Sequence, residues 1–230
     1  MKCDNPINCN ECKWKSNSLF RELAETDKEF LFSEKNQLHF KKGQQIFQEG
    51  TVPRGLYCIQ EGKVKIAQLG NDGKEIILHL AKGSDIMGHR AILGEDTFSC
   101  SAYALEDTNI CFIPRSTFVQ LVKKNTNLSF QILQLLAREL KESETRTTII
   151  AQSNSRDKII QSLNLLIDCY GFEHDGKTID VIVSREELAN LSGTTRETAI
   201  RVLTELKDEH LIDLDHKKII ILDRSFLCLF

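Results

Sequence analysis

Three cysteines lie close together near the amino terminus, at Cys3, Cys9 and Cys12. Their spacing is Cys-x5-Cys-x2-Cys and the residues around them are polar, so packing in a hydrophobic core does not account for them. Thiolates bind zinc and iron–sulfur clusters, and they also carry out thiol–disulfide exchange. The tail therefore indicates a metal site or a redox site, with chance clustering as the remaining alternative.

A second set of reactive side chains, Arg196, Glu197 and Arg201, lies on one predicted helix near the carboxyl end. All three fall away from the apolar face of that helix. Arginine can donate two hydrogen bonds to guanine, and glutamate can accept one from the amino group of cytosine. Such charges can also form an ordinary solvated surface. The elements predicted around this helix are therefore needed to distinguish a DNA-binding helix from a solvated one.

The neighbouring elements predict a winged helix-turn-helix. Ser184 is placed to cap a first helix with Glu187 as its capping-box partner, and Gly193 supplies the turn before the second helix. Two β-rich runs follow, at residues 211–214 and 218–222, and they predict the hairpin of the wing. The predicted DNA-binding residues are Ser184, Arg185, Thr194, Thr195, Arg196, Glu197 and Arg201.

With these motifs in place, the whole chain resembles the Crp/Fnr family of bacterial transcription regulators. Residues 193–201, Gly-Thr-Thr-Arg-Glu-Thr-Ala-Ile-Arg, are similar to the recognition helix of the cyclic-AMP receptor branch, which reads TGTGA-like half-sites. The Fnr branch lacks the first arginine and usually has serine where Ile200 stands. The resemblance implies a homodimer that binds a palindromic TGTGA-like site, rather than TTGAT, on double-stranded DNA and contacts RNA polymerase.

The resemblance also implies an α+β fold with four parts. A cysteine-rich tail over residues 1–18 precedes a cyclic-nucleotide-binding-like β-roll over 19–114, where short β-rich runs alternate with glycine-containing turns. A single long dimerisation helix over 115–152 then leads to the winged helix-turn-helix over 153–230. Apolar residues recur along the long helix at spacings of three and four, as in a coiled coil. The predicted dimerisation residues are Leu133, Leu136, Leu140, Ser143, Thr147 and Ile150.

The roll departs from the nucleotide-binding branch at the residues that would hold a cyclic phosphate. That branch has Gly-Glu-Leu and, about ten residues later, Arg-Ser; here His89 stands at the carboxylate position and Ser99 at the arginine position. We therefore do not expect cyclic AMP to be the effector, although Arg90 could serve another anion. The predicted ligand pocket consists of Gly88, His89, Arg90, Ser99 and Cys100.

Cys111 connects the amino-terminal cysteines to the roll. Residues 104–114 resemble the Fnr segment that supplies the distant fourth cysteine of an iron–sulfur cluster. The resemblance implies that Cys3, Cys9, Cys12 and Cys111 hold a [4Fe-4S] cluster sensitive to oxygen or nitric oxide. The order of the two gaps in the tail is the reverse of the usual Fnr order. A zinc or thiol redox switch, and a small ligand or haem in the roll, remain as alternative effectors.

Composition limits the remaining classes of function. The chain has 230 residues, a net charge of −3 and 41% apolar residues, which suits two modest globular domains. With a net negative charge, attraction to phosphates must come from local basic patches. No signal peptide or membrane-spanning run is evident, so we expect a cytoplasmic protein. Cys9-Asn10-Glu11-Cys12 lacks the strand that precedes a redox Cys-x-x-Cys, and no other catalytic motif stands out, so no enzyme activity is expected.

Overall fold

A computed structural model of the chain describes residues 18–70 and 73–228. The contacts divide these residues into two compact units. The first contains residues up to Gln68 together with Ala81–Glu142, and the second contains Leu69–Leu80 together with the residues from Ser143 onward. The division passes through the end of one β-hairpin and through one long helix, so each unit is built from two separate stretches of sequence.

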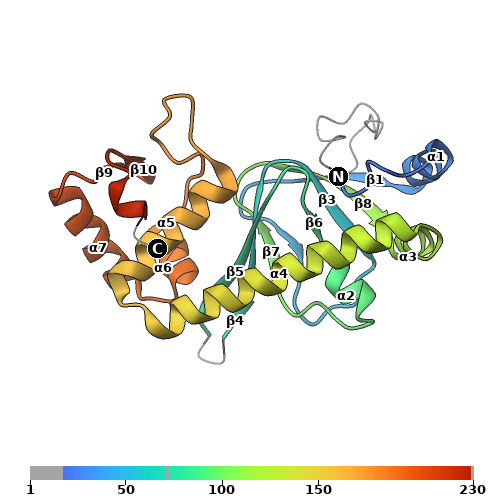
Figure 1. Cartoon of the computed structure of the whole chain (residues 1–230), viewed down its shortest axis with the longest axis horizontal. Coiled ribbons are helices and arrows are strands. Elements are labelled where there is room, and N and C mark those ends of the chain that lie inside the picture. The colour runs from blue at the N-terminus through green and yellow to red at the C-terminus, as the bar shows by residue number, and fades with distance from the viewer. Residues whose placement is uncertain (1–17, 71–72, 229–230) are drawn as a thin grey trace. The chain divides into compact units, whose positions relative to one another are not determined.

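The amino-terminal unit is a β-roll of two antiparallel four-stranded sheets (Figure 1). The first sheet has the order β1 (Asn36–Phe40), β8 (Thr108–Pro114), β3 (Gly55–Glu61) and β6 (Ile86–Met87). The second has the order β2 (Gln45–Phe47), β7 (Ser101–Ala104), β4 (Lys63–Leu69) and β5 (Glu75–Lys82). The predicted β-rich runs all form strands, because apolar residues alternate along them and glycine turns separate them.

The first sheet is buried on both faces. Ile59 and Ile110 point into the space between the sheets, where they pack with Val64 and Ala102 of the second sheet. Their strand neighbours Leu56 and Ile113 point to the opposite face, because successive side chains of a strand alternate between faces. On that face they join a separate core with the helices of the unit.

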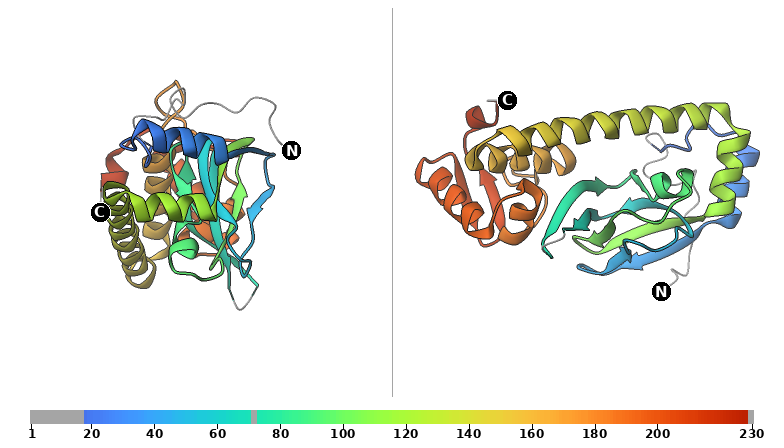
Figure 2. Two further views of the ribbon diagram at one scale, coloured as in Figure 1. Left: turned by 90° about the vertical axis from the view of Figure 1, so that its right-hand side faces the viewer. Right: turned by 90° about the horizontal axis from the view of Figure 1, so that it is seen from below.

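The helices that cover this face are α1 (Glu25–Glu34) and α3 (Arg115–Lys124), which lie side by side in Figure 2. Leu31 of α1 and Phe118 and Leu121 of α3 are almost completely buried there, together with Phe20 and Leu23 from the segment before α1. A short helix, α2 (His89–Leu93), follows β6. The segment after the tail is therefore anchored on the same face of the sheet as α3.

The predicted single helix over residues 115–152 is wrong, because the structure has two helices there. α3 ends at Lys124, Asn125 is extended (φ −113°, ψ 104°), and α4 begins at Thr126 and runs to Gln152. The Asn125 side chain donates to the Leu121 carbonyl at 3.2 Å and to Asp27 Oδ2 at 3.1 Å. These bonds satisfy groups that the end of α3 leaves open, and they tie the break to buried Asp27.

The carboxyl-terminal unit is a winged helix. Its elements are α5 (Ser155–Tyr170), α6 (Arg185–Ser192), α7 (Arg196–Asp208), the antiparallel pair β9 (Ile212–Asp215) and β10 (Lys218–Ile221), and a 3-10 turn, η1 (Ser225–Cys228). Ile159 and Leu163 of α5, Leu188 of α6 and Leu203 of α7 form a dry centre, since each is at most 1% exposed. The last residues of α4, Ser143–Gln152, and the end of the β4–β5 hairpin belong to the same unit.

Candidate functional site

The helix-turn-helix has the predicted capping and turn. Ser184 Oγ accepts a hydrogen bond from the Glu187 amide at 3.1 Å, and Glu187 Oε2 accepts one from the Ser184 amide at 2.8 Å. This reciprocal pair begins α6 at Arg185. Gly193 then adopts the left-handed conformation (φ 64°, ψ 35°), which a residue with a side chain rarely takes. Thr195 caps α7 by accepting from the Thr198 amide at 3.2 Å.

The three predicted base-reading residues are all exposed on α7, while Ala199, Val202 and Leu203 are buried beneath them. Arg196 and Glu197 occupy its first turn. Hydrogen bonds from the backbone at Glu197 and then from Thr195 lower the pKa of the Glu197 carboxyl, so it is an ionised acceptor at neutral pH. Arg201 donates to Glu205 at 2.5 Å and must leave that partner to reach a base.

The other predicted DNA-binding residues differ in how free their side chains are. The Ser184 hydroxyl is engaged in the capping box, and Thr195 Oγ1 in the cap of α7. Thr194 Oγ1 lies 2.8 Å from Ser192 Oγ inside the turn. Arg185 is half-buried and its guanidinium lies 3.4 Å from the His216 carbonyl of the wing turn. Most of these side chains hold the motif in shape, whereas the α7 charges remain available.

Sequence reasoning missed Arg146, which braces the helix-turn-helix from α4. Its guanidinium donates to the Leu191 carbonyl near the end of α6 and to the Leu78 carbonyl of β5, each at 2.6 Å. Burial lowers the pKa of Arg146 to about 10, so the group is still charged at neutral pH. A cation at the carboxyl-terminal carbonyls of a helix is favourable there. The reading motif therefore depends on a side chain 38 residues before its first residue, a distance no local pattern reveals.

The predicted dimerisation residues do not form one uniform surface. Leu133 and Leu140 are 62% and 61% exposed, and Ser143 and Thr147 are exposed. Leu136 instead packs against the helical core of the first unit. Ile150 approaches the turn, where its side chain lies about 4 Å from the position that a Cβ on Gly193 would take. Phe130, which the sequence analysis left out, is 61% exposed on the same side of α4 as Leu133 and Leu140 by helical spacing.

The predicted ligand pocket is split between two places. His89, at the start of α2, is 3% exposed, and its Nε2 lies 3.2 Å from Glu139 Oε2 on α4. Its Nδ1 is buried without a hydrogen-bond partner. Gly88 caps α2 in the left-handed conformation (φ 88°), where a Cβ would lie 3.2 Å from the Phe98 ring. His89 thus connects the roll to α4.

Arg90, Ser99 and Cys100 form the other part of the predicted pocket. Burial raises the pKa of the Cys100 thiol, while a hydrogen bond with Ser99 and the charge of Arg90 act in the opposite direction. Arg90 and Ser99 are exposed. The half-buried Cys100 thiol is therefore hydrogen-bonded with Ser99 and lies within electrostatic range of the exposed Arg90 guanidinium.

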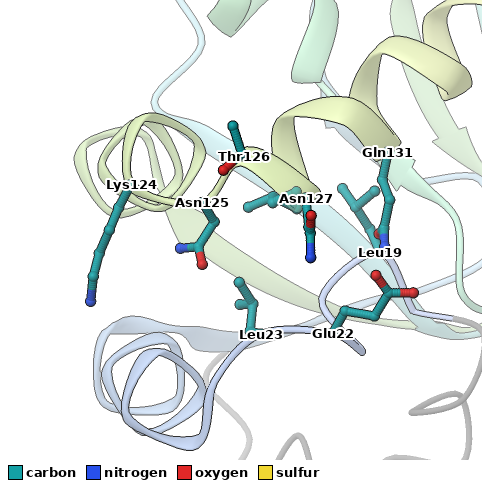
Figure 3. Close-up of a pocket in the computed structure, with 9 residues that line it drawn as sticks. Leu19, Glu22, Leu23, Lys124, Asn125, Thr126, Asn127 and Gln131 are labelled. Atoms are coloured by element: carbon teal, nitrogen blue, oxygen red, sulfur yellow. The ribbon is translucent and has the colours of Figure 1, made fainter.

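A cavity of about 170 Å³ lies elsewhere, at the break between α3 and α4 (Figure 3). Its lining includes Glu22, Leu23, Lys124, Asn125 and Gln131, and none of the predicted pocket residues. The polar groups that line it come mainly from the ends of the two helices. Nothing in the arrangement distinguishes it from a solvated groove.

Cys111 lies on β8 with its side chain half-buried. It is on the same face of the sheet as Ile113, which packs with Phe20 and Leu23 of the segment that follows the tail. Cys3, Cys9 and Cys12 lie outside the described residues. Within residues 18–70 and 73–228, no three His, Cys, Asp or Glu side chains are grouped as metal ligands. No helix in that part of the chain is long and apolar enough to cross a membrane.

Comparison with known proteins gives each unit a family. Residues 37–125 match the cyclic nucleotide-binding domain, and residues 158–230 match the Crp-like helix-turn-helix domain. The cyclic AMP receptor protein of Thermus thermophilus is 28% identical over 87% of this chain and 90% of its own length. The anaerobic regulatory protein of Bacillus subtilis is 27% identical over 86% of this chain and 85% of its own.

Solved structures agree with this match. TTHA1359, a transcriptional regulator of the CRP/FNR family from Thermus thermophilus, is similar with a TM-score of 0.70 at 25% identity, covering 83% of this chain and 95% of its own. FixK2 from Bradyrhizobium japonicum shares the fold, with a TM-score of 0.74 at 18% identity over 84% of this chain and 95% of its own. With its roll, its long helix and its exposed reading helix, this chain belongs to the Crp/Fnr family of transcription regulators, whose role is DNA binding and not catalysis.

Proposed function

We propose that this regulator binds a palindromic TGTGA-like site as a homodimer and contacts RNA polymerase there. The observation that carries the proposal is the exposure of Arg196, Glu197 and Arg201 on one side of α7, which is capped and held by a fixed turn. Two arginines and an ionised glutamate match a guanine-rich half-site. A palindrome requires two copies related by a two-fold axis.

The second copy is expected along α4. Phe130, Leu133 and Leu140 are each more than 60% exposed, at spacings of three and seven residues. That spacing repeats one stripe of a coiled coil, and large apolar side chains in such a stripe gain stability when a partner helix covers them. Ser143 and Thr147 continue the stripe as polar residues, so pairing should be strongest in the amino-terminal half of α4.

Selection of bound sequences from random DNA tests the reading proposal. We expect TGTGA-like half-sites arranged as a palindrome, and enrichment of TTGAT instead would contradict the proposal. The matched variant Arg196→Lys keeps the charge but removes the planar fork, so it should keep non-specific binding and lose guanine discrimination at one position. A dimer mass in solution that Leu133→Asp reduces to a monomer would support the α4 interface.

For the effector, we propose an iron–sulfur cluster held by Cys3, Cys9, Cys12 and Cys111. Cys111 fits this role because it is half-buried on the face where the chain emerges from the tail. Leu19 lies seven positions after Cys12, and an extended stretch of that length reaches roughly 25 Å, so loop closure is not limiting. A bound cluster would supply sensitivity to oxygen or nitric oxide through its oxidation and loss.

Protein purified without oxygen tests the cluster. We expect broad visible absorbance, with iron and sulfide in the ratio of a [4Fe-4S] cluster, and bleaching in air. Cys111→Ser should abolish the colour, whereas Cys169→Ser, at a half-buried thiol on α5, should keep it. Colourless, iron-free protein after anaerobic handling would contradict the cluster and leave the DNA-binding proposal untouched.

One observation favours a second effector, a small ligand or haem in the roll. His89 Nδ1 is buried without a partner, and a buried polar atom of that kind calls for a donor or a ligand atom. Haem would give a sharp absorption band that shifts in His89→Ala, while a colourless ligand would appear in the mass spectrum of the denatured protein. Absence of both from protein purified under native conditions would remove this candidate.

A further inference from the structure

Cys58 and Cys111 stand directly opposite each other in the first sheet. The register pairs Cys58 of β3 with Cys111 of β8, between the pairs Tyr57–Phe112 and Ile59–Ile110. Directly opposed residues of an antiparallel pair lie on the same face of the sheet. Both thiols are therefore on the face that carries Leu56 and Ile113, and both are half-buried.

The hydrogen bonding of the two strands fixes the spacing of this pair. The Arg115 amide donates to the Arg54 carbonyl at 3.0 Å, in the same register as the Cys58–Cys111 pair. Backbone groups alternate in direction along a strand, so Cys58, four residues after Arg54, also turns its amide and carbonyl toward β8. The pair is thus of the hydrogen-bonded type, for which the Cα atoms lie about 5.5 Å apart.

That spacing allows a disulfide but not a relaxed one. Disulfides usually join Cα atoms about 4.4–6.8 Å apart, which includes this pair. Their Cβ atoms are usually about 3.5–4.5 Å apart, whereas opposed strand residues have Cβ atoms about 4.5–5.5 Å apart. The strands must shift slightly for the bond to close, and a strained disulfide of this kind is easily reduced.

We propose that Cys58 and Cys111 form a reversible thiol pair, which closes to an intramolecular disulfide on reaction with a low-molecular-weight disulfide such as oxidised glutathione. The pair deepens the regulation proposed at Cys111, since a disulfide there and a cluster bound there exclude each other. Its formation does not require the cluster, so metal-free protein gives an answer whether or not a cluster exists.

The reaction balances with the oxidant as the only added reagent. One thiol loses a proton, and its thiolate attacks the disulfide to form a mixed disulfide and release one thiolate. The opposite thiol then loses its proton and displaces the second glutathione thiolate from the mixed disulfide. Two cysteine thiols are oxidised, one disulfide is reduced to two thiols, and the two released thiolates take up the two protons.

Peptide mapping of the full-length, chelator-treated protein tests the pair. The protein is exposed to oxidised glutathione, its remaining thiols are alkylated, and it is digested without reductant. Trypsin releases Cys58 within residues 55–63, but Cys100 and Cys111 together within 91–115, so a second cleavage after Glu106 is needed to separate them. We expect residues 55–63, intact or cleaved after Glu61, joined to residues 107–115, and the link should disappear after dithiothreitol.

Matched variants assign the link. Cys100→Ser should leave the link between Cys58 and Cys111 unchanged. In Cys58→Ala, we expect Cys111 to carry glutathione instead of the link, and the variant to remain folded. Half-buried Cys169, on α5, serves as an internal control that should carry glutathione and no cross-link. Separate glutathione adducts on Cys58 and Cys111 in the unmodified chain, or a link from either one to an amino-terminal cysteine, would overturn the proposal.

Discussion

The DNA-reading motif and the effector roll differ in how their candidate sites are assembled. Ser184, Gly193 and Arg201 lie within 18 consecutive residues, and each does its work through neighbours a few positions away. In the roll, His89 meets Glu139 across 50 residues, and Cys58 meets Cys111 across 53. The residues of the DNA-reading motif are neighbours in the sequence, whereas the residues of the roll come together only when the sheets have formed.

This difference has a physical consequence for variation. Apart from the brace from Arg146, the reading motif depends on caps and one turn, whose individual contributions are about 1 kcal/mol, so we expect it to survive loss of packing in the core of the roll. A site whose residues are brought together by strand register is lost when the strands separate, because nothing else in the chain holds those residues close to one another. Recognition should therefore be robust to damage in the roll, while effector sensing should not.

The largest effect is expected from a substitution that destabilises the core of the roll and leaves the reading motif folded. Leu121 on α3 is 1% exposed in the core that holds α1 and α3 on the sheet. Leu121→Ala should reduce the unfolding free energy of the first unit by about 2–5 kcal/mol. Hydrogen exchange should show faster exchange in β3 and β8 while residues 185–208 keep their protection. Leu69→Ala, at a 64% exposed leucine, is the matched control, and equal loss of protection in both units would refute the independence.

A smaller effect is expected at the reading helix itself. Arg196→Ala should weaken binding to a TGTGA-like palindrome by about 1–3 kcal/mol in each half-site, because a bidentate guanine contact is lost. Affinity for unrelated DNA should fall much less. Titration of both DNAs at fixed salt measures the ratio. Lys207→Ala, on the last turn of the same helix, where Lys207 is paired with Asp213, should leave that ratio unchanged.

Asp27 gives the first unit a pH dependence of stability that originates at one buried carboxyl. A hydrogen bond from Lys124 at 2.5 Å, with another from Asn125, lowers the pKa of this buried carboxyl. A depressed folded-state pKa gives stability that is present above the unfolded pKa of about 4 and is lost as the pH falls through the folded value.

Replacement of the Asp27 carboxyl should make the free energy of unfolding depend less on pH in the acid range. Asp27→Asn should cost about 1–2 kcal/mol at neutral pH and remove the corresponding loss below pH of about 4. Urea unfolding at a series of pH values measures both. Asp107→Asn is the control, since Asp107 is exposed and its partner Lys41 is exposed too. A variant that keeps the full acid dependence would show that other carboxyls are responsible.

The smallest effect is expected from the cap of α6. Ser184→Ala removes the acceptor for the Glu187 amide and should lower the stability of the second unit by about 1 kcal/mol. Because the side chain is engaged in the cap, specific and non-specific DNA affinity should fall together. Thermal unfolding and the affinity ratio check these points, with Thr204→Ala on the exposed side of α7 for comparison. A selective loss of specific binding would assign Ser184 to DNA contact instead.

The sequence predicted the strands and the reading motif well, since both follow from short-range patterns. It missed α1, because Glu25–Glu34 buries only Asp27 and Leu31 and shows almost no amphipathic periodicity. It missed the break at Asn125, because that residue is held by Asp27, almost 100 residues earlier. The packing of Leu136 against its own unit was not foreseen, because helical spacing alone does not show which groups a half-buried side chain contacts. The pairing of Cys58 with Cys111 was also missed, since only the strand register reveals it.

The contact between Arg146 and the Leu78 carbonyl limits how this protein can be cut into fragments. Arg146 also donates to α6, so the guanidinium needs both the hairpin end and the reading motif to satisfy its buried donors. Leu78 precedes Arg146 by 68 residues, and most of the roll lies between them in the chain. A fragment beginning at residue 143 keeps α5, α6 and α7 but leaves the Arg146 donor without the Leu78 carbonyl. No single cleavage therefore yields the complete DNA-binding unit. An isolated version of that unit would need the end of the β4–β5 hairpin added to it, or Arg146 replaced.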